Sequence, residues 1–225
     1  MNNLILPAAT TTTTIDTGMS LWDMVVKGGW LMIPIFILSV IAVYVFIERY
    51  IQIRKCSRLD RSFIDQISTC LHKGDPLGAI AICKKVDSPM SRMLIKGILH
   101  RRLPANEIRE MIENSANLEV SALEKGLTTL ATCSGMAPMI GFLGTVVGMV
   151  QAFYDMALAG NNINITLLSR GIYTAMITTV AGLMVGIPAY LAYNVLTARI
   201  DAVVNQMNSI SSDFMEIIYE ETAEK

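Results

Sequence analysis

The chain has 225 residues, of which 52% are hydrophobic and only 16% are charged, and its mean hydropathy is +0.47. Because an average soluble domain carries about 25% charged residues, this composition favours a membrane protein over a soluble helical bundle. The net charge of −1 gives no reason to expect nucleic acid as a partner.

The first 27 residues are predicted to form a lead outside the membrane, with a short interfacial helix at Ser20–Lys27. A cleaved signal peptide is not expected here, since Lys27 is the only basic residue before the first apolar run. That run ends in Glu48 and Arg49 and offers no small-residue cleavage site.

Three long runs contain no Asp, Glu, Lys or Arg. They cover residues 28–47, 126–154 and 171–198 and are 20, 29 and 28 residues long. A bilayer core of about 30 Å requires roughly 20 helical residues, so each run can cross once. We predict membrane-spanning helices at 28–47, 127–154 and 171–198, and we expect the last two to project beyond the hydrocarbon.

The basic residues predict the orientation. Fourteen of the 18 Lys and Arg residues lie between Arg49 and Lys125, whereas residues 155–170 hold one. The positive-inside rule therefore assigns residues 48–126 to a cytoplasmic helical domain and residues 155–170 to a periplasmic loop. The predicted fold is an all-α integral membrane protein with three transmembrane helices, its N-terminus outside and a C-terminal helix at 199–225 inside.

The cytoplasmic part is predicted to be helical. Asp75-Pro76 and Ser88-Pro89 are typical helix starts. After Pro104, apolar residues recur at helical spacing up to Gly126, which predicts one helix that continues unbroken into the second crossing. The third crossing is expected to continue as a helix whose apolar stripe packs on the cytoplasmic helices or on a neighbouring subunit. This stripe consists of Ile200, Val203, Val204, Met207, Ile210, Phe214, Ile217 and Ile218.

No pattern indicates an enzyme, a metal site or a cofactor. The four cysteines form no CxxC motif, and His72 and His100 are 28 residues apart. The cysteines are expected to be reduced, buried small hydrophobes. The three crossings hold no histidine, lysine or aspartate for an intramembrane catalytic base or acid, and no phosphate-binding loop is present.

Small and mildly polar residues form a stripe on each of the last two crossings, at steps of three and four residues. Threonine adds hydroxyl groups to these stripes, and the spacings Gly144–Gly148 and Gly182–Gly186 are typical of tight helix packing in membranes. Helix packing alone and the lining of a pore are both compatible with the pattern. The stripes are Ser134, Pro138, Gly141, Thr145, Gly148 and Ala152 on the second crossing, and Ala175, Thr178, Gly182, Gly186 and Ala189 on the third, flanked by Thr174 and Thr179.

The stripe segments also carry a resemblance. "APMIGFLGTVVGMVQAF" followed by "SRGIYTAMITTVAGLMVGIPAYLAYN" resembles the membrane signature of the MotA/TolQ/ExbB proton-channel family. "GDPLGAIAIC" at Gly74–Cys83 resembles a short cytoplasmic motif of the same proteins. The similarity extends from the first crossing to the third. Three crossings resemble ExbB and TolQ, since flagellar MotA subunits have four.

The resemblance implies a subunit of an energy-transducing complex in the bacterial inner membrane. Five copies, a homopentamer, would surround two helices of an ExbD- or TolR-like partner that acts with a TonB- or TolA-like protein. The family's pore threonines correspond to Thr145 and Thr179. Many members have a glutamate in a "GIxEAL" context, where this chain reads "GIYTAM" with Thr174. An ExbB-like or a TolQ-like role, and protons or sodium as the coupling ion, both stay open.

Threonine does not gain or lose protons near neutral pH. A proton relay across a bilayer needs a titratable group or a continuous chain of water. We therefore expect a partner helix to supply the carboxylate, an aspartate, along a path of hydroxyls from Thr145, Thr174, Thr178 and Thr179. The alternative is a non-conducting membrane scaffold whose stripes only pack helices.

Overall fold

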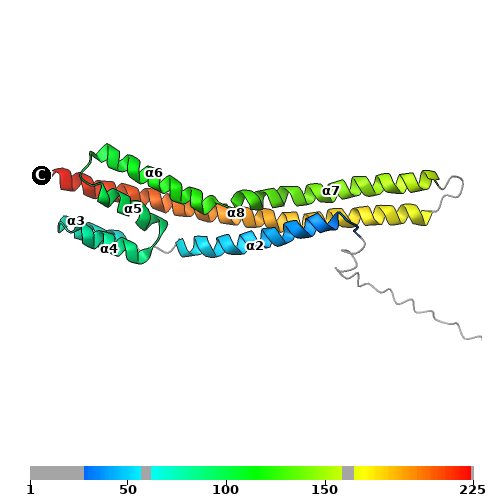
Figure 1. The fold of residues 1–225 in the computed structure, drawn as a ribbon, viewed down its shortest axis with the longest axis horizontal. Helices are drawn as coiled ribbons and strands as arrows, with labels where there is room; N and C mark the ends of the chain where they lie inside the picture. Colours follow the sequence, from blue (N-terminus) through cyan, green and yellow to red (C-terminus); the bar gives the residue numbers. More distant parts are fainter. Residues whose placement is uncertain (1–27, 57–61, 159–164, 224–225) are drawn as a thin grey trace, which may run out of the picture.

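The computed structural model describes residues 28–56, 62–158 and 165–223, and within these ranges the chain is helical apart from short turns. Figure 1 shows a long rod in which three long helices lie side by side at one end. They are α2 (Met32–Cys56), α7 (Leu127–Leu158) and α8 (Ile165–Ala223). Four shorter helices lie beside the C-terminal half of α8: α3 (Ser62–His72), α4 (Pro76–Val86), α5 (Pro89–Leu99) and α6 (Ala105–Glu124). Of these, α3, α5 and α6 pack on α8, and α4 packs on α3 and α5. The all-α prediction is confirmed.

Three helical segments are long and apolar enough to cross a membrane: Met32–Arg54, Ala105–Leu158 and Leu168–Glu220. These segments contain residues 32–47 of the first charge-free run and all of the other two runs, so the prediction of three spans is confirmed. The 32 residues of α7 measure about 48 Å at 1.5 Å per residue. This length exceeds a hydrocarbon core of about 30 Å.

The ends of the spans differ slightly from the predicted boundaries. The first helix begins at Met32, four residues later than predicted, because the chain turns at Gly29 with φ +71°. The predicted lead at 1–27, with its interfacial helix at Ser20–Lys27, lies outside the described residues, as do residues 159–164 of the predicted loop. The orientation across the membrane stays a prediction.

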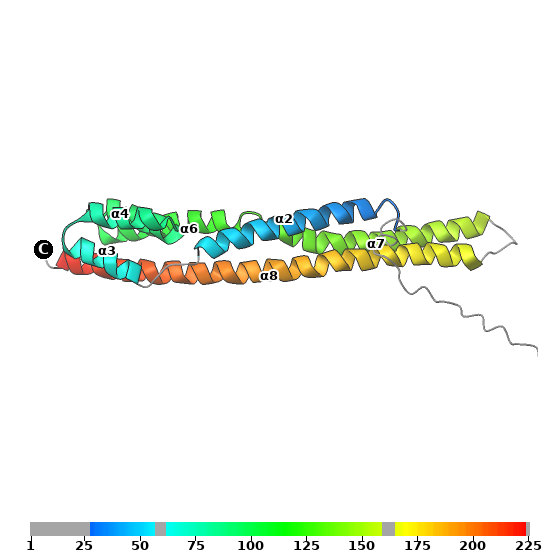
Figure 2. The ribbon, with the colours of Figure 1, turned by 90° about the horizontal axis from the view of Figure 1, so that it is seen from below.

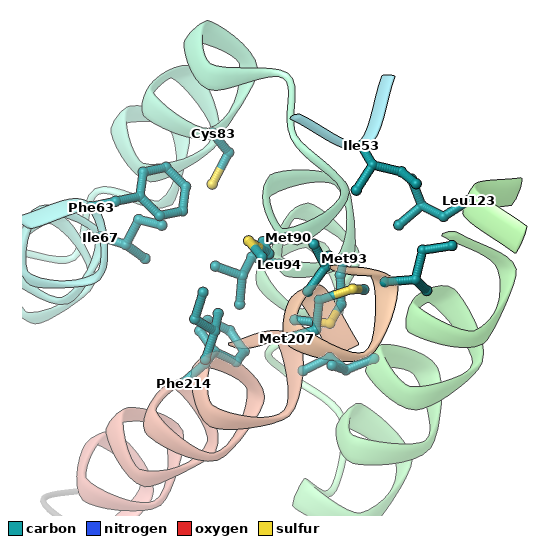
Figure 3. Packing of buried hydrophobic residues seen from close by; sticks show 14 of the residues in the cluster. Ile53, Phe63, Ile67, Cys83, Met90, Met93, Leu94, Leu123, Met207 and Phe214 are labelled. Atoms are coloured by element: carbon teal, nitrogen blue, oxygen red, sulfur yellow. The ribbon is translucent and has the colours of Figure 1, made fainter. Parts of the chain in front are cut away.

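The third span continues without interruption into the helical domain, as predicted. Helix α8 has 59 residues and is therefore about 90 Å long. Every residue of its predicted apolar stripe is buried except Val204, which is half-buried. The stripe packs on the shorter helices of the same chain, and Figure 3 shows Met207 and Phe214 of α8 among core side chains from α3, α4 and α5.

The two predicted helix starts are confirmed by their caps. The Asp75 carboxylate accepts a hydrogen bond from the backbone N–H of Gly78 at 3.0 Å, at the start of α4. The Ser88 hydroxyl accepts one from the backbone N–H of Ser91 at 3.1 Å, at the start of α5. A proline follows each capping residue, where its missing N–H costs no helical hydrogen bond.

The structure contains the four cysteines as free thiols, and the expectation that they are buried holds for two of them. Cys83 and Cys133 are buried, and Cys56 and Cys70 are half-buried. Burial raises the pKa of the Cys83 thiol to about 11. This thiol is therefore neutral at physiological pH and packs as a small hydrophobic group between α4 and its neighbours.

The prediction of one unbroken helix from Pro104 into the second crossing is wrong. Helix α6 ends at Glu124 and α7 begins at Leu127, with Gly126 at φ +91° between them. Only glycine adopts this left-handed conformation without a steric penalty. The Arg49 guanidinium of α2 packs in the resulting elbow, where it donates a hydrogen bond to the Ala122 carbonyl at 3.4 Å. Figure 2 shows α6 and α7 as separate segments along α8.

Candidate functional site

The small-residue stripes of α7 and α8 face each other in one tight contact. A Cβ atom placed on Gly141 of α7 would lie 2.8 Å from the backbone oxygen of Thr178 on α8. A Cβ on Gly182 of α8 would lie 2.5 Å from the backbone oxygen of Ala137 on α7. Since real Cβ atoms do not approach oxygen so closely, the two backbones touch here because glycine has no side chain.

The contact extends in both directions from this point. Gly144 abuts the side chain of Thr178, and a Cβ on Gly148 would lie 2.8 Å from the Cβ of Ala175. Further along, Gly186 lies against Pro138 and the carbonyl oxygen of Ser134. Because proline has no N–H, Pro138 cannot donate the usual helical hydrogen bond to the Ser134 carbonyl. The structure thus brings seven predicted small residues into one interface: Ser134, Pro138, Gly141, Gly144, Gly148, Gly182 and Gly186.

Two threonine hydroxyls of α8 converge on one carbonyl of α7. Thr178 is only 2% exposed, and its hydroxyl donates to the Ala175 carbonyl of its own helix at 2.7 Å. The same hydroxyl lies 3.4 Å from the Gly141 carbonyl, to which Thr179 also donates at 3.0 Å. Because Gly141 lacks a side chain, its backbone oxygen is accessible to both groups.

The other two predicted threonines lie beside this contact. Thr145 and Thr174 are half-buried. The Thr145 hydroxyl donates to the Phe142 carbonyl of its own helix at 2.6 Å. Thr145 follows Gly144 by one residue and is rotated by about 100° from it, so it lies at the edge of the glycine face. Within one chain, the glycines are used in helix packing, and Thr145 and Thr174 lie outside the closest part of this contact.

Sequence reasoning missed part of the interface. Gly171 was not in the predicted stripe, yet a Cβ there would lie 2.5 Å from the Cβ of Ala152. The Gly141 carbonyl was also missed as an acceptor. Spacing along one helix identifies a face, but it does not give the register of α7 on α8. Gly135, in contrast, has open space around it.

The interface is uncharged. Residues 126–154 and 171–198 contain no Asp, Glu, Lys, Arg or His. Among the residues that the structure describes, no group of three or more His, Cys, Asp and Glu is arranged to hold a metal ion. The hydroxyls can orient water or a polar group of another molecule, but they cannot themselves store a proton near neutral pH.

Comparison with known proteins identifies a family that shares this part of the sequence. Residues 85–209, which include α5, α6, α7 and much of α8, match the MotA/TolQ/ExbB proton channel family. The chain belongs to this family. The match contains both stripes of the α7–α8 interface, whereas the Gly74–Cys83 motif and the first crossing lie before it. The family description names a channel, in agreement with the transport function expected from the resemblance.

Relatives in the MotA/TolQ/ExbB family carry both ExbB and TolQ names. The chain is 30% identical over 179 residues to a protein of Methanothermobacter thermautotrophicus named as an ExbB homologue, covering 78% of this chain and 63% of that protein. It is 28% identical to the biopolymer transport protein ExbB of Neisseria gonorrhoeae, over 71% of this chain and 80% of that protein. It is 36% identical to the Tol-Pal system protein TolQ of Haemophilus influenzae, over 46% of this chain and 45% of that protein.

Proposed function

We propose that this chain is the pore-forming subunit of a motor in the bacterial inner membrane that is driven by the proton-motive force. Its role is ExbB-like: proton flow is coupled to a TonB-type protein that energises transport across the outer membrane. The observation that carries the proposal is the pair of uncharged stretches, residues 127–154 of α7 and 171–198 of α8, which hold threonine hydroxyls at a glycine-lined contact inside the family match.

The proton carrier belongs to a partner in this proposal. An ExbD- or TolR-like protein with one transmembrane helix supplies an aspartate, and five copies of the present chain surround two such helices. Thr145 and Thr179, which the sequence resemblance matches to the family's pore threonines, offer their hydroxyls along the path of that carboxylate. Each proton that descends 100 mV releases about 2.3 kcal/mol, which is available to move the inserted helices relative to the pore.

Two alternatives have specific support. The 36% identity with TolQ of Haemophilus influenzae favours a TolQ-like role in envelope maintenance through a TolA-like protein. The enclosure of the glycines in packing within one chain favours a non-conducting scaffold. A neighbouring reading frame for a short protein with one transmembrane helix and an aspartate near its start would support the channel over the scaffold.

The proposal is tested by the variant Thr145→Val in the complex formed on co-expression with that small membrane protein. Valine keeps the shape and removes the hydroxyl. Loss of one hydrogen bond to a polar or charged group costs about 1–2 kcal/mol, so we expect proton flux to fall roughly tenfold. Flux is measured with a pH-sensitive dye in liposomes under a potassium diffusion potential.

Matched variants separate this effect from a loss of structure. Thr145→Ser keeps the hydroxyl and is expected to keep most of the flux. Thr132→Val removes an exposed hydroxyl of α7 that also donates to its own helix, to the Thr128 carbonyl at 2.8 Å, and is expected to leave flux unchanged. Unchanged flux in Thr145→Val would remove the role assigned to Thr145, and an assembled complex that conducts no protons would favour the scaffold.

A further inference from the structure

An apolar groove lies between α2 and α8 within the predicted spans. Its volume is about 550 Å³, and Ser39 is the one polar side chain among the residues that line it. The two helices run in the same direction and lie side by side along this stretch (Figures 1 and 2). The main walls are Ala42, Val43 and Phe46 on α2, and Met184, Leu191 and Val195 on α8.

The depth of the groove matches one leaflet of a bilayer. Its lining on α8 extends from Met184 to Val195, which is about 17 Å of helix at 1.5 Å per residue. Half of a hydrocarbon core of about 30 Å is about 15 Å. Val43 and Leu191 at the groove are 55% and 59% exposed, so its mouth is open at the surface of the chain.

A cationic group is held at the end of the groove nearest the helical domain. One turn beyond Phe46, the Tyr50 ring lies 5.7 Å from the Phe46 ring between centroids and is tilted by 45° to it. One turn beyond Val195, the guanidinium of Arg199 lies 4.5 Å from the centre of the Tyr50 ring. Arg199 also donates to the Tyr50 hydroxyl at 3.4 Å. The tyrosine therefore fixes the arginine directly beside the apolar walls.

The charge of Arg199 is available to an anion. Among the described residues it forms no ion pair. Asp201 is two positions further along α8 and is therefore rotated by about 200° to the other side of the helix. Glu48, the acidic residue at this level of α2, lies 4.0 Å from Arg49. Arg199 is an exposed residue at the boundary between the apolar span and the basic domain.

We propose that the groove binds an anionic phospholipid, with an acyl chain between α2 and α8 and the phosphate on Arg199. Basic residues at the end of a groove between transmembrane helices are suited to anionic head groups. A depth of one leaflet fits an acyl chain, and the apolar walls exclude a polar ligand. This lipid holds α2 against α8 at the boundary where α8 enters the helical domain.

The proposal is tested with the full chain purified in a neutral detergent and titrated with dioleoyl phosphatidylglycerol or dioleoyl phosphatidylcholine, with binding read by native mass spectrometry. We expect the wild type to prefer phosphatidylglycerol, and Arg199→Gln to weaken that binding about fivefold. Arg199→Lys is expected to retain the preference. Arg102→Gln, in the turn between α5 and α6, makes the same charge change away from the groove and is expected to bind as the wild type does.

Two further measurements test the groove itself. Ala192→Phe fills the groove and is expected to weaken binding of both lipids while Arg199 stays intact. A benzoylphenylalanine photo-crosslinker at Leu191, activated in native membranes, is expected to yield a lipid adduct. Equal binding of phosphatidylglycerol by Arg199→Gln and the wild type would overturn the proposal. So would adducts only with protein, which would assign the groove to a neighbouring copy or another subunit.

Discussion

At the scale of single residues, two glycines determine how closely α7 and α8 approach each other. Gly141 and Gly182 each face the backbone of the opposite helix, so no rotation of a neighbouring side chain can make room for a methyl group. The same close approach opens the Gly141 carbonyl to Thr178 and Thr179. Packing and the placement of the hydroxyls therefore depend on the same residue.

Gly141→Ala is expected to destabilise the α7–α8 pair by about 1–3 kcal/mol, the usual cost of overpacking. The free energy of unfolding is measured in mixed micelles by titration with dodecyl sulfate. Gly135→Ala is the control, because it makes the same change on the same helix where nothing lies within 4 Å. Equal stability of the two variants would contradict the close approach described here.

The residues of this interface were largely predictable from the sequence, but their pairing was not. Steps of three and four residues place Gly141, Thr145 and Gly148 near one helix face whatever lies opposite. The register between two helices depends on side-chain packing along their whole length. For this reason the sequence could not separate Thr178, which is buried, from Thr145, which is half-buried and bonded to its own helix.

At the scale of elements, the elbow at Gly126 separates the second span from the domain helix α6. The third span has no such break, since α8 continues through the boundary for 59 residues. The side chain of Arg49 fills the elbow from α2. The first and second spans therefore meet at this level, where α2 is continuous and the helix of the second span is interrupted.

Gly126→Ala is expected to lower the free energy of unfolding by about 1–2 kcal/mol, the cost of a side chain in the left-handed conformation. Its Cβ would also lie 3.0 Å from Nε of Arg49. Unfolding is followed by circular dichroism in the same micelles as for Gly141→Ala. If Gly126→Ala proved as stable as Gly135→Ala, the interruption would be absent and the predicted unbroken helix would be restored.

Helix starts and apolar stripes were predicted correctly because each depends on local chemistry. Asp75 and Ser88 cap their helices by contacts within three residues, and the α8 stripe follows from helical periodicity. The elbow left no such signal. Apolar residues recur at helical spacing both before Lys125 and after Gly126. A single glycine is also tolerated inside a helix, so the sequence did not indicate a break here.

At the scale of the whole molecule, the helical domain and the membrane spans lie at opposite ends of the rod and differ in how many apolar side chains they bury. The buried core is largest in the helical domain, where α3 to α6 and α8 contribute, and it continues to Ile53 of α2 (Figure 3) and Leu130 of α7. The spans leave large apolar residues outside; Phe142 and Tyr190, for example, are 66% and 57% exposed. Such surfaces are expected to contact lipid and other subunits. The spans could be predicted from the sequence because they depend on local hydropathy. A pore could not, because it depends on contacts between several chains.

Reconstitution in liposomes tests whether the proton-carrying group belongs to the partner and not to this chain. The purified chain is compared with the complex that contains the single-helix partner, under the same potassium diffusion potential and with internal pH followed by a dye. Because the spans carry no carboxylate, amine or imidazole, we expect rapid acidification only with the complex. Acidification by the chain alone at the rate of the complex would contradict the assignment of the proton-carrying group to the partner.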